Sequence, residues 1–239
     1  MVISWWSLLW CIVPVAIVAA IYACWCAEDL LEVLYACLRM VIQLALVGFA
    51  LIWLFDHPDA YISVAVILGM LGIAAWIAIR PLRKLAEFSP HSWLGAVIAL
   101  VIGVGICLLI TMLGVLAISP WFKPSFIIPL AGMYLANSMN VISLSAERYF
   151  AERRGGCYKS QAKKRAFKAS MIPQVNGLFA VGLVSLPGMM TGQIISGVEP
   201  MIAVRYQIMI MAMLLGSTGM AAALMLNWLS SKDRILRNT

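Results

Sequence analysis

Residues 171–200, MIPQVNGLFAVGLVSLPGMMTGQIISGVEP, form the stretch that decides how this chain folds. The run is long enough to cross a bilayer, since about 20 apolar residues span the hydrocarbon at about 1.5 Å per residue. It also contains a Pro187–Gly188 pair, and Gly188 and Gly192 repeat at four-residue spacing. Because proline has no N–H, Pro187 leaves the carbonyl of Leu183 without its helical partner. An unpaired carbonyl in lipid costs several kcal/mol, so this broken helix is predicted to lie against protein or a wet cavity.

The composition around this stretch predicts an all-α polytopic membrane protein. The 239 residues are 64% hydrophobic and 11% charged, with a mean hydropathy of +0.98. A soluble domain is about 45–50% apolar and about 25% charged. Several apolar runs exceed about 18 residues, which excludes a very apolar soluble protein. We therefore expect a single transmembrane domain over residues 1–239.

Seven membrane spans are predicted from the apolar runs. The first apolar run begins with aromatic residues, which are common where a span meets the membrane interface. The N-terminus has neither the basic region nor the small-residue cleavage site of a signal peptide. We therefore expect a retained first span and no signal peptide. The predicted spans lie at about residues 5–26, 33–55, 61–79, 92–118, 126–146, 172–196 and 203–229.

The distribution of the net charge of +7 predicts the orientation. Fourteen of the 17 lysines and arginines lie in the RPLRK run at 80–84, in residues 147–168 and in the C-terminal tail. Short loops rich in lysine and arginine stay in the cytoplasm. Seven crossings put all three regions there, with the N-terminus outside and the C-terminus cytoplasmic. Contact with anionic lipid headgroups is also expected, and no nucleic-acid partner.

A polar stripe marks the fifth predicted span. Asn137, Asn140, Ser143 and Glu147 follow at spacings of three, three and four residues, which favours one helical face. Such a stripe either lines a conduction path or supplies hydrogen bonds between helices, at about 0.6 kcal/mol each. The two alternatives are compatible. Gln193 in the sixth predicted span is assigned to the same path.

Arg39 and Gln43 lie four residues apart in the second predicted span. An arginine inside a span costs at least a few kcal/mol unless it faces protein, water or a counter-charge, which makes it a candidate path residue. The alternative is that Arg39 lies near the cytoplasmic end and extends to the headgroups.

No metal site or enzymatic motif is assigned. Cys24 and Cys26 form only a C-x-C pair without a second pair nearby, and the methionines of the IMIMAM run at 208–213 are expected to pack apolar gaps. The sequence contains no G-x-x-x-x-G-K-[ST] phosphate loop, no H-E-x-x-H and no G-x-S-x-G. We therefore expect no enzyme and no cofactor bound by this chain itself.

Three stretches carry a family resemblance. They are VGLVSLPGMMTGQIISGVEPMIAVRYQIMIMAMLL at 181–215, IIPLAGMYLANSMNVISLSAERYF at 127–150 and LRMVIQLALVGFALIWLF at 38–55. They resemble the FetB-type permeases of ABC transporters, a group associated with iron export and aluminium sensitivity. The resemblance covers about residues 28–229.

The resemblance implies the permease subunit of an ABC exporter in the plasma (inner) membrane. A homodimer would move an iron-like cation, driven by a separate ATPase subunit that binds ATP on the cytoplasmic face. The loop after the fifth span is shorter than in the family, and its basic residues are expected to couple to the ATPase: Arg153, Arg154, Lys163, Lys164 and Arg165. The alternatives are a non-transporting membrane scaffold and a proton-coupled secondary transporter.

Overall fold

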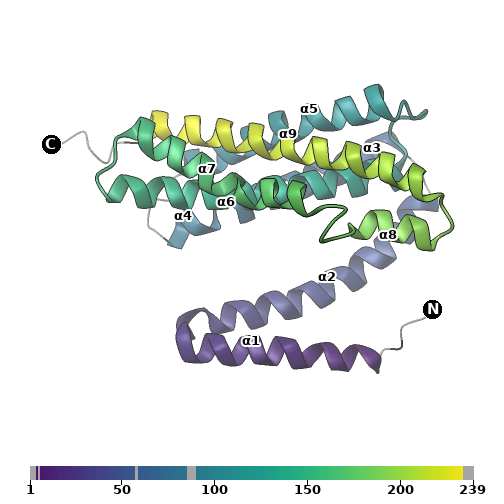
Figure 1. Cartoon of the computed structure of the whole chain (residues 1–239), viewed down its shortest axis with the longest axis horizontal. Coiled ribbons are helices and arrows are strands. Elements are labelled where there is room, and N and C mark those ends of the chain that lie inside the picture. Colours follow the sequence, from purple (N-terminus) through teal and green to yellow (C-terminus); the bar gives the residue numbers. More distant parts are fainter. Residues whose placement is uncertain (1–3, 5, 57–58, 85–89, 234–239) are drawn as a thin grey trace. The chain divides into compact units, whose positions relative to one another are not determined.

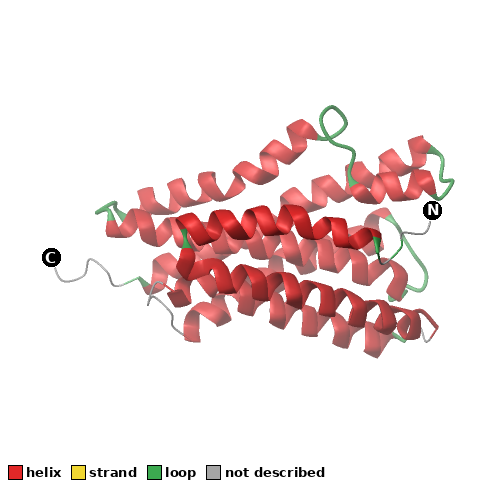
Figure 2. Ribbon diagram, turned by 90° about the horizontal axis from the view of Figure 1, so that it is seen from below, coloured by secondary structure: helices red, strands yellow, loops and turns green. Residues whose placement is uncertain are grey.

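A computed structural model describes residues 4, 6–56, 59–84 and 90–233, and the regular elements among them are helices (Figures 1 and 2). The chain divides into two compact units, Met1–His57 and Pro58–Thr239. Each unit is described by itself. Residues 85–89 and the basic tail residues Arg234 and Arg237 lie outside the described residues.

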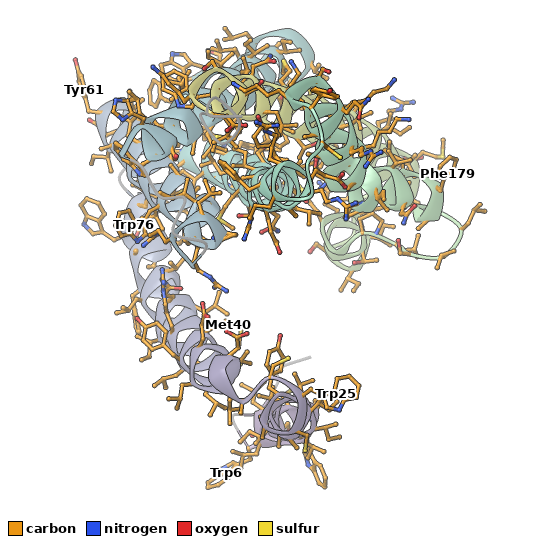
Figure 3. All side chains as sticks on the ribbon, turned by 90° about the vertical axis from the view of Figure 1, so that its left-hand side faces the viewer. Trp6, Trp25, Met40, Tyr61, Trp76 and Phe179 are labelled. Carbon is orange, nitrogen blue, oxygen red and sulfur yellow. The ribbon has the colours of Figure 1, made fainter. Side chains whose placement is uncertain are left out.

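The first unit contains two long apolar helices. A 3₁₀ turn η1 (Ser7–Cys11) leads into α1 (Ile12–Trp25), and η2 (Ala27–Asp29) leads into α2 (Leu30–Asp56). Only Leu54 is buried among the described residues of these elements. Figure 3 shows Trp6 and Trp25 projecting outward from this unit, and both are about four-fifths exposed. Apolar surface of this kind is stable in a bilayer or against another protein.

The second unit is a helical bundle built around α6 (Pro124–Arg154). Its other elements are α3 (Ala60–Ala78), α4 (Arg80–Lys84), α5 (Pro90–Leu109), the π-helical turn η3 (Ile110–Val115), α7 (Lys159–Ala180), α8 (Gly188–Ile195) and α9 (Pro200–Lys232). Helix α6 packs against α3, α5, α7 and α9. Tyr134, Ile142 and Tyr149 of α6 are fully buried along its length.

Small residues bring α5 and α9 together, and this pair has the most extensive contact in the bundle (Figure 1). A Cβ added at Gly103 would lie 3.0 Å from the backbone oxygen of Ser217 and from the backbone nitrogen of Ala221. Lipid chains are as apolar as side chains, so helices in a membrane associate through close packing of this kind. Gly103, in the fourth predicted span, therefore serves the close packing of the bundle.

Six helices among the described residues are long and apolar enough to cross a membrane. This confirms the prediction of an all-helical, multi-pass membrane protein. The candidate spans are Ser7–Trp25, Leu30–Asp56, Ala60–Ala78, His91–Val115, Pro124–Arg154 and Pro200–Lys232. The predicted span at 172–196 is not among them.

Residues 172–196 are divided between two helices. Helix α7 ends at Ala180, α8 begins at Gly188, and residues 181–187 form a turn in which Gly182 has a φ of +81°. Only glycine adopts that conformation readily. The carbonyl of Ala180 accepts hydrogen bonds from the backbone nitrogens of Val184 at 2.8 Å and Ser185 at 3.1 Å. The helix is therefore interrupted by a hydrogen-bonded turn over the seven residues 181–187, whereas the sequence predicted an interruption only at Pro187–Gly188.

Candidate functional site

A cavity of about 450 Å³ lies between α6, α7 and α9. Three amide side chains line it: Asn137 and Asn140 from α6, and Gln174 from α7. The thioether of Met211 on α9 completes the side opposite α6 and α7, and the remaining lining is mostly apolar. We call this the amide cavity. It concentrates neutral hydrogen-bonding groups between α7 and two candidate membrane spans, α6 and α9.

Two of the amides bridge α6 and α7. Gln174 Nε2 donates a hydrogen bond to Asn137 Oδ1 at 3.4 Å, and Asn137 Nδ2 donates to the carbonyl of Met133 at 2.9 Å. Asn140 lies one turn further along α6 and is exposed at the cavity. Each amide carries both donors and an acceptor. The cavity can therefore supply oxygen ligands to a cation or hydrogen bonds to a polar ligand.

The sequence analysis did not assign Gln174 to the path. Gln174 is followed three residues later by Gly177, and it is preceded four residues earlier by Ser170; all three line the amide cavity. That spacing is the pattern of one helical face. The pattern was present in the sequence, but only the packing of α7 against α6 shows which face of α7 meets the asparagines.

The polar stripe of α6 divides between two sides of the helix. Ser143 Oγ donates a hydrogen bond to the carbonyl of Ala78 on α3 at 2.9 Å, and Glu147 is exposed without lining the amide cavity. Each residue of an α-helix turns by about 100°, so six residues separate Asn137 from Ser143 by about 120° around the axis. The amide cavity therefore includes Asn137 and Asn140, whereas Ser143 joins two helices.

The other predicted path residues lie elsewhere. Gln193 on α8 does not line the amide cavity, and its Oε1 is buried without a hydrogen-bond partner among the described residues. Gly188 and Gly192 are exposed, and a Cβ added at either would meet nothing within 4 Å. Pro187 directly precedes α8, where its carbonyl accepts from the backbone nitrogen of Thr191 at 3.0 Å.

Arg39 and Gln43 form a pair within α2, in the first unit. With the Gln43 amide oriented so that its oxygen faces Arg39, that oxygen accepts from Arg39 Nε at 3.0 Å and Nη2 at 3.2 Å. Gln43 is exposed and Arg39 is half-buried. The i, i+4 spacing thus gives the guanidinium a polar partner on its own helix.

The corner between α6 and α7 is fastened to the end of α9 by a buried ion pair. Arg153 Nε lies 2.5 Å from Asp233 Oδ2, and the Tyr149 hydroxyl donates to the same oxygen at 2.8 Å. Lys159 Nζ donates to the backbone carbonyl of Asp233 at 2.7 Å. Arg153 is only 2% exposed, so it cannot meet a docking protein directly, contrary to the coupling role expected for it.

A second ionic cluster covers the same corner. Glu152 accepts from Arg148 at 2.5 Å and from Arg165 at 2.8 Å, and the Cys157 thiol lies 3.3 Å from Glu152 Oε2. The hydrogen bond to Glu152 raises the pKa of Arg165 above its usual value, which keeps the guanidinium charged. The sequence analysis missed Glu152 and Asp233, because acidic residues in a basic region gave no signal of pairing.

The remaining expected coupling residues reach the surface. Arg154 and Lys164 are exposed, and so is much of Arg165. Lys163 is half-buried, and its Nζ donates to Asn227 Oδ1 on α9 at 3.0 Å. Arg154 at the end of α6 and Lys164 and Arg165 near the beginning of α7 therefore form the basic surface that a partner can contact.

Among the described residues, no group of three or more histidine, cysteine, aspartate or glutamate side chains is placed to hold a metal ion. Cys24 and Cys26 are exposed and not joined in a disulfide. Of the methionines in the 208–213 run, Met211 lines the amide cavity and Met209 is buried.

Comparison with known proteins places these features in a family. The profile of an uncharacterised protein family, UPF0014, matches residues 5–156 and 158–233. The chain is 32% identical over 205 residues to a protein of Escherichia coli K12 named "Probable iron export permease protein FetB", covering 80% of this chain and 76% of that one. It is 29% identical over 201 residues to the Arabidopsis thaliana protein ALUMINUM SENSITIVE 3, covering 78% and 71%. It is 30% identical over 211 residues to the Bacillus subtilis membrane protein YjkA, covering 81% of each. No solved structure matches the chain.

Proposed function

Because this chain belongs to the UPF0014 family of membrane proteins, we propose that it is the permease subunit of an ABC-type exporter and that a metal cation crosses at the amide cavity. The observation that carries the proposal is the Asn137–Gln174 hydrogen bond across that cavity. Polar side chains inside a membrane bundle are costly unless they are paired or serve a path. The 3.4 Å bond between Gln174 and Asn137, together with the bond from Asn137 to the Met133 carbonyl, still leaves most of the donors and acceptors of the three amides for a ligand.

The proposed cargo is an iron-like cation. Amide oxygens are hard ligands that suit hard or borderline cations, and the Met211 thioether adds one softer ligand. The relative named for iron export supports this choice of cargo.

Helix α7 provides a route for coupling to an ATPase. One continuous helix carries Lys164 and Arg165 of the basic surface near its beginning and Gln174 ten residues after Lys164. At about 1.5 Å per residue, the two regions lie about 15 Å apart along the axis. A push on the basic surface would be transmitted along α7, past the internal Pro173, to Gln174 and would separate it from Asn137.

The ionic corner gives that movement a fixed pivot. Asp233 ties the end of α9 to Arg153 of α6 and to Lys159 of α7. Glu152 ties α6 to Arg165, which lies six residues after Lys159 on α7. We propose that the separate ATPase subunit, which would bind ATP, docks on Arg154, Lys164 and Arg165 beside this pivot.

The proposed topology keeps seven crossings, with the N-terminus outside and the C-terminus in the cytoplasm of the inner membrane. The twelve residues of α7 after Lys168 and the eight of α8 together approach the about 20 residues that one crossing needs. Transporters build such crossings from two half-helices around an irregular turn. Leu183, Val184 and Ile195 beside this break are between 84% and 90% exposed, which supports a homodimer contact or lipid contact there.

Reconstitution into proteoliposomes with an ATPase subunit tests the proposal. Iron(II) flux should require both proteins and ATP hydrolysis, and it should fall when Asn137 and Gln174 are both replaced by alanine. A membrane scaffold would give no flux and no stimulated hydrolysis. Flux that persists without ATP and stops when the proton gradient is removed would instead assign a secondary transporter.

A further inference from the structure

An apolar groove of about 350 Å³ lies in the second unit, separate from the amide cavity. It runs between α3 and the α5–η3 helix, and Trp121 and Ile127 line one end. Val64 and Leu68 of α3 contribute one wall. We propose that this groove holds one acyl chain of a bound phospholipid, with the phosphate of that lipid near Lys123.

The π-helical turn creates the space. Helix α5 changes to π geometry at Ile110, and the backbone nitrogen of Leu116 bonds to the carbonyl of Thr111 at 2.9 Å. Thr111 is fixed in the core, where its hydroxyl donates to the carbonyl of Cys107 at 2.7 Å and lies 3.0 Å from that of Tyr134. A π turn inserts an extra residue, and such bulges often occur at functional sites. With Thr111 held inward, Met112 and Leu113 form the groove wall.

The dimensions of the groove match one leaflet. Its wall extends from the beginning of the α6 segment along η3 to Gly105 on α5. The eight residues from Gly105 to Leu113 correspond to about 12 Å of helix, which is close to half of the about 30 Å hydrocarbon thickness of a bilayer. A chain that enters at the headgroup level would therefore reach Gly105 near the middle of the membrane.

The groove opens to the lipid side of α3. Val64, Leu68, Leu109 and Leu113 are between 39% and 61% exposed. Figure 3 shows Tyr61 and Trp76 of the same helix α3 pointing away from the bundle. Helices α3, α5–η3 and α6 are all candidate membrane spans. In a bilayer the surrounding medium on this side is acyl chain.

The end of the groove that Trp121 lines carries the features of a headgroup site. Trp121 lines the groove beside an exposed lysine, Lys123, whose carbonyl accepts from the backbone nitrogen of Ile127 at 3.2 Å. Ser63 is fully buried at the beginning of α3, and its hydroxyl contacts the carbonyl of Phe122 at 3.1 Å. The Trp121–Lys123 segment is thus held against α3. Tryptophan prefers the membrane interface, and an interfacial lysine is complementary to a lipid phosphate.

The test measures, by native mass spectrometry of the full chain, how many phospholipid molecules stay bound after a delipidating detergent wash. Gly105→Leu is the filling variant, because an added Cβ at Gly105 meets nothing within 4 Å and the side chain then occupies the groove. Gly69→Leu is the matched control, since Gly69 lies on α3 in equally open space but does not line the groove. We expect one retained phospholipid in the unchanged protein and in Gly69→Leu, and its loss in Gly105→Leu.

A second measurement uses Trp121 as a reporter in vesicles that contain phosphatidylglycerol with brominated acyl chains. The bromine atoms quench tryptophan fluorescence, and the contribution of Trp121 is the difference in quenching between the unchanged protein and Trp121→Phe. This contribution should disappear in Gly105→Leu. Lys123→Gln should lower the amount of retained anionic phospholipid several-fold. Equal retention in Gly105→Leu and Gly69→Leu would overturn the acyl site. If Lys123→Gln retains as much phospholipid as the unchanged protein, the headgroup assignment is wrong. If the protein is instead a lipid-free dimer whose interface covers this groove, the occupant is a second copy of the chain and the lipid proposal is overturned.

Discussion

Gln174 on α7 donates a hydrogen bond to Asn137 on α6 at 3.4 Å, across a cavity that Asn140 also lines. The two residues are separated by 37 positions in the chain. They connect the helix that begins at the basic corner with the most extensively packed helix of the bundle.

The first prediction concerns this hydrogen bond. Gln174→Leu should reduce ATP-dependent metal flux about tenfold, equivalent to about 1.4 kcal/mol, because it removes both the ligand and the link to Asn137. Stability should change by less than about 1 kcal/mol, since such bonds contribute about 0.6 kcal/mol in membranes. Flux and thermal unfolding in detergent are the measurements. Asn176→Leu is the control, because Asn176 is exposed and outside the cavity; an equal loss there would remove Gln174 from the path.

Ser143 provides the complementary case. Ser143→Ala removes the hydrogen bond to the Ala78 carbonyl and should cost about 0.6 kcal/mol of stability. Transport per folded molecule should not change, because Ser143 faces α3 and not the amide cavity. A loss of flux as large as that of Asn137→Ala, without a change in unfolding temperature, would return Ser143 to the path.

The buried ion pair should dominate the stability of the α6–α9 corner. Asp233→Ala leaves the Arg153 guanidinium buried without its partner, which should cost about 3–5 kcal/mol. Combining Asp233→Leu with Arg153→Met should recover most of that loss, because no isolated charge remains. Urea or thermal unfolding of the purified protein measures both variants. Equal destabilisation in the single and double variants would contradict the pairing.

The basic surface should control contact with the ATPase without supporting the fold. Arg154→Glu together with Lys164→Glu should reduce stimulated ATP hydrolysis by about tenfold, and unfolding temperature should stay the same, because both side chains are exposed. The stimulation should also weaken with salt, since exposed charges are screened over about 8–10 Å at physiological ionic strength. Arg205→Glu is the control, because Arg205 is exposed near the beginning of α9, away from the corner where α9 ends, and it should leave hydrolysis unchanged.

Two glycines of α5 should respond in opposite ways. Gly103→Ala should destabilise the protein by about 1–3 kcal/mol, because its Cβ would lie 3.0 Å from backbone atoms of α9. Gly105→Ala should be close to neutral, because its Cβ meets nothing within 4 Å. The unfolding temperatures of the two variants measure this difference. A lower value for Gly103→Ala alone indicates close helix packing, whereas equal changes in both variants indicate a general effect of replacing glycine.

The sequence determined the class of protein, most of the membrane spans and the family. Apolar runs longer than about 18 residues have one stable environment, which is why composition alone identified a polytopic helical protein. Pro187 and Gly188 also marked residues 171–200 as irregular, and the structure places the beginning of α8 at that pair.

The tertiary structure decided which polar side chains meet. Spacing along α6 grouped Asn137 with Ser143, but the helix turns them about 120° apart, so packing sends one to the amide cavity and the other to α3. Arg153 belonged to a basic loop in sequence, and only the fold brings Asp233 from 80 positions away to bury it. Periodicity defines the faces of a single helix, whereas the choice of partner for each face depends on contacts between distant helices.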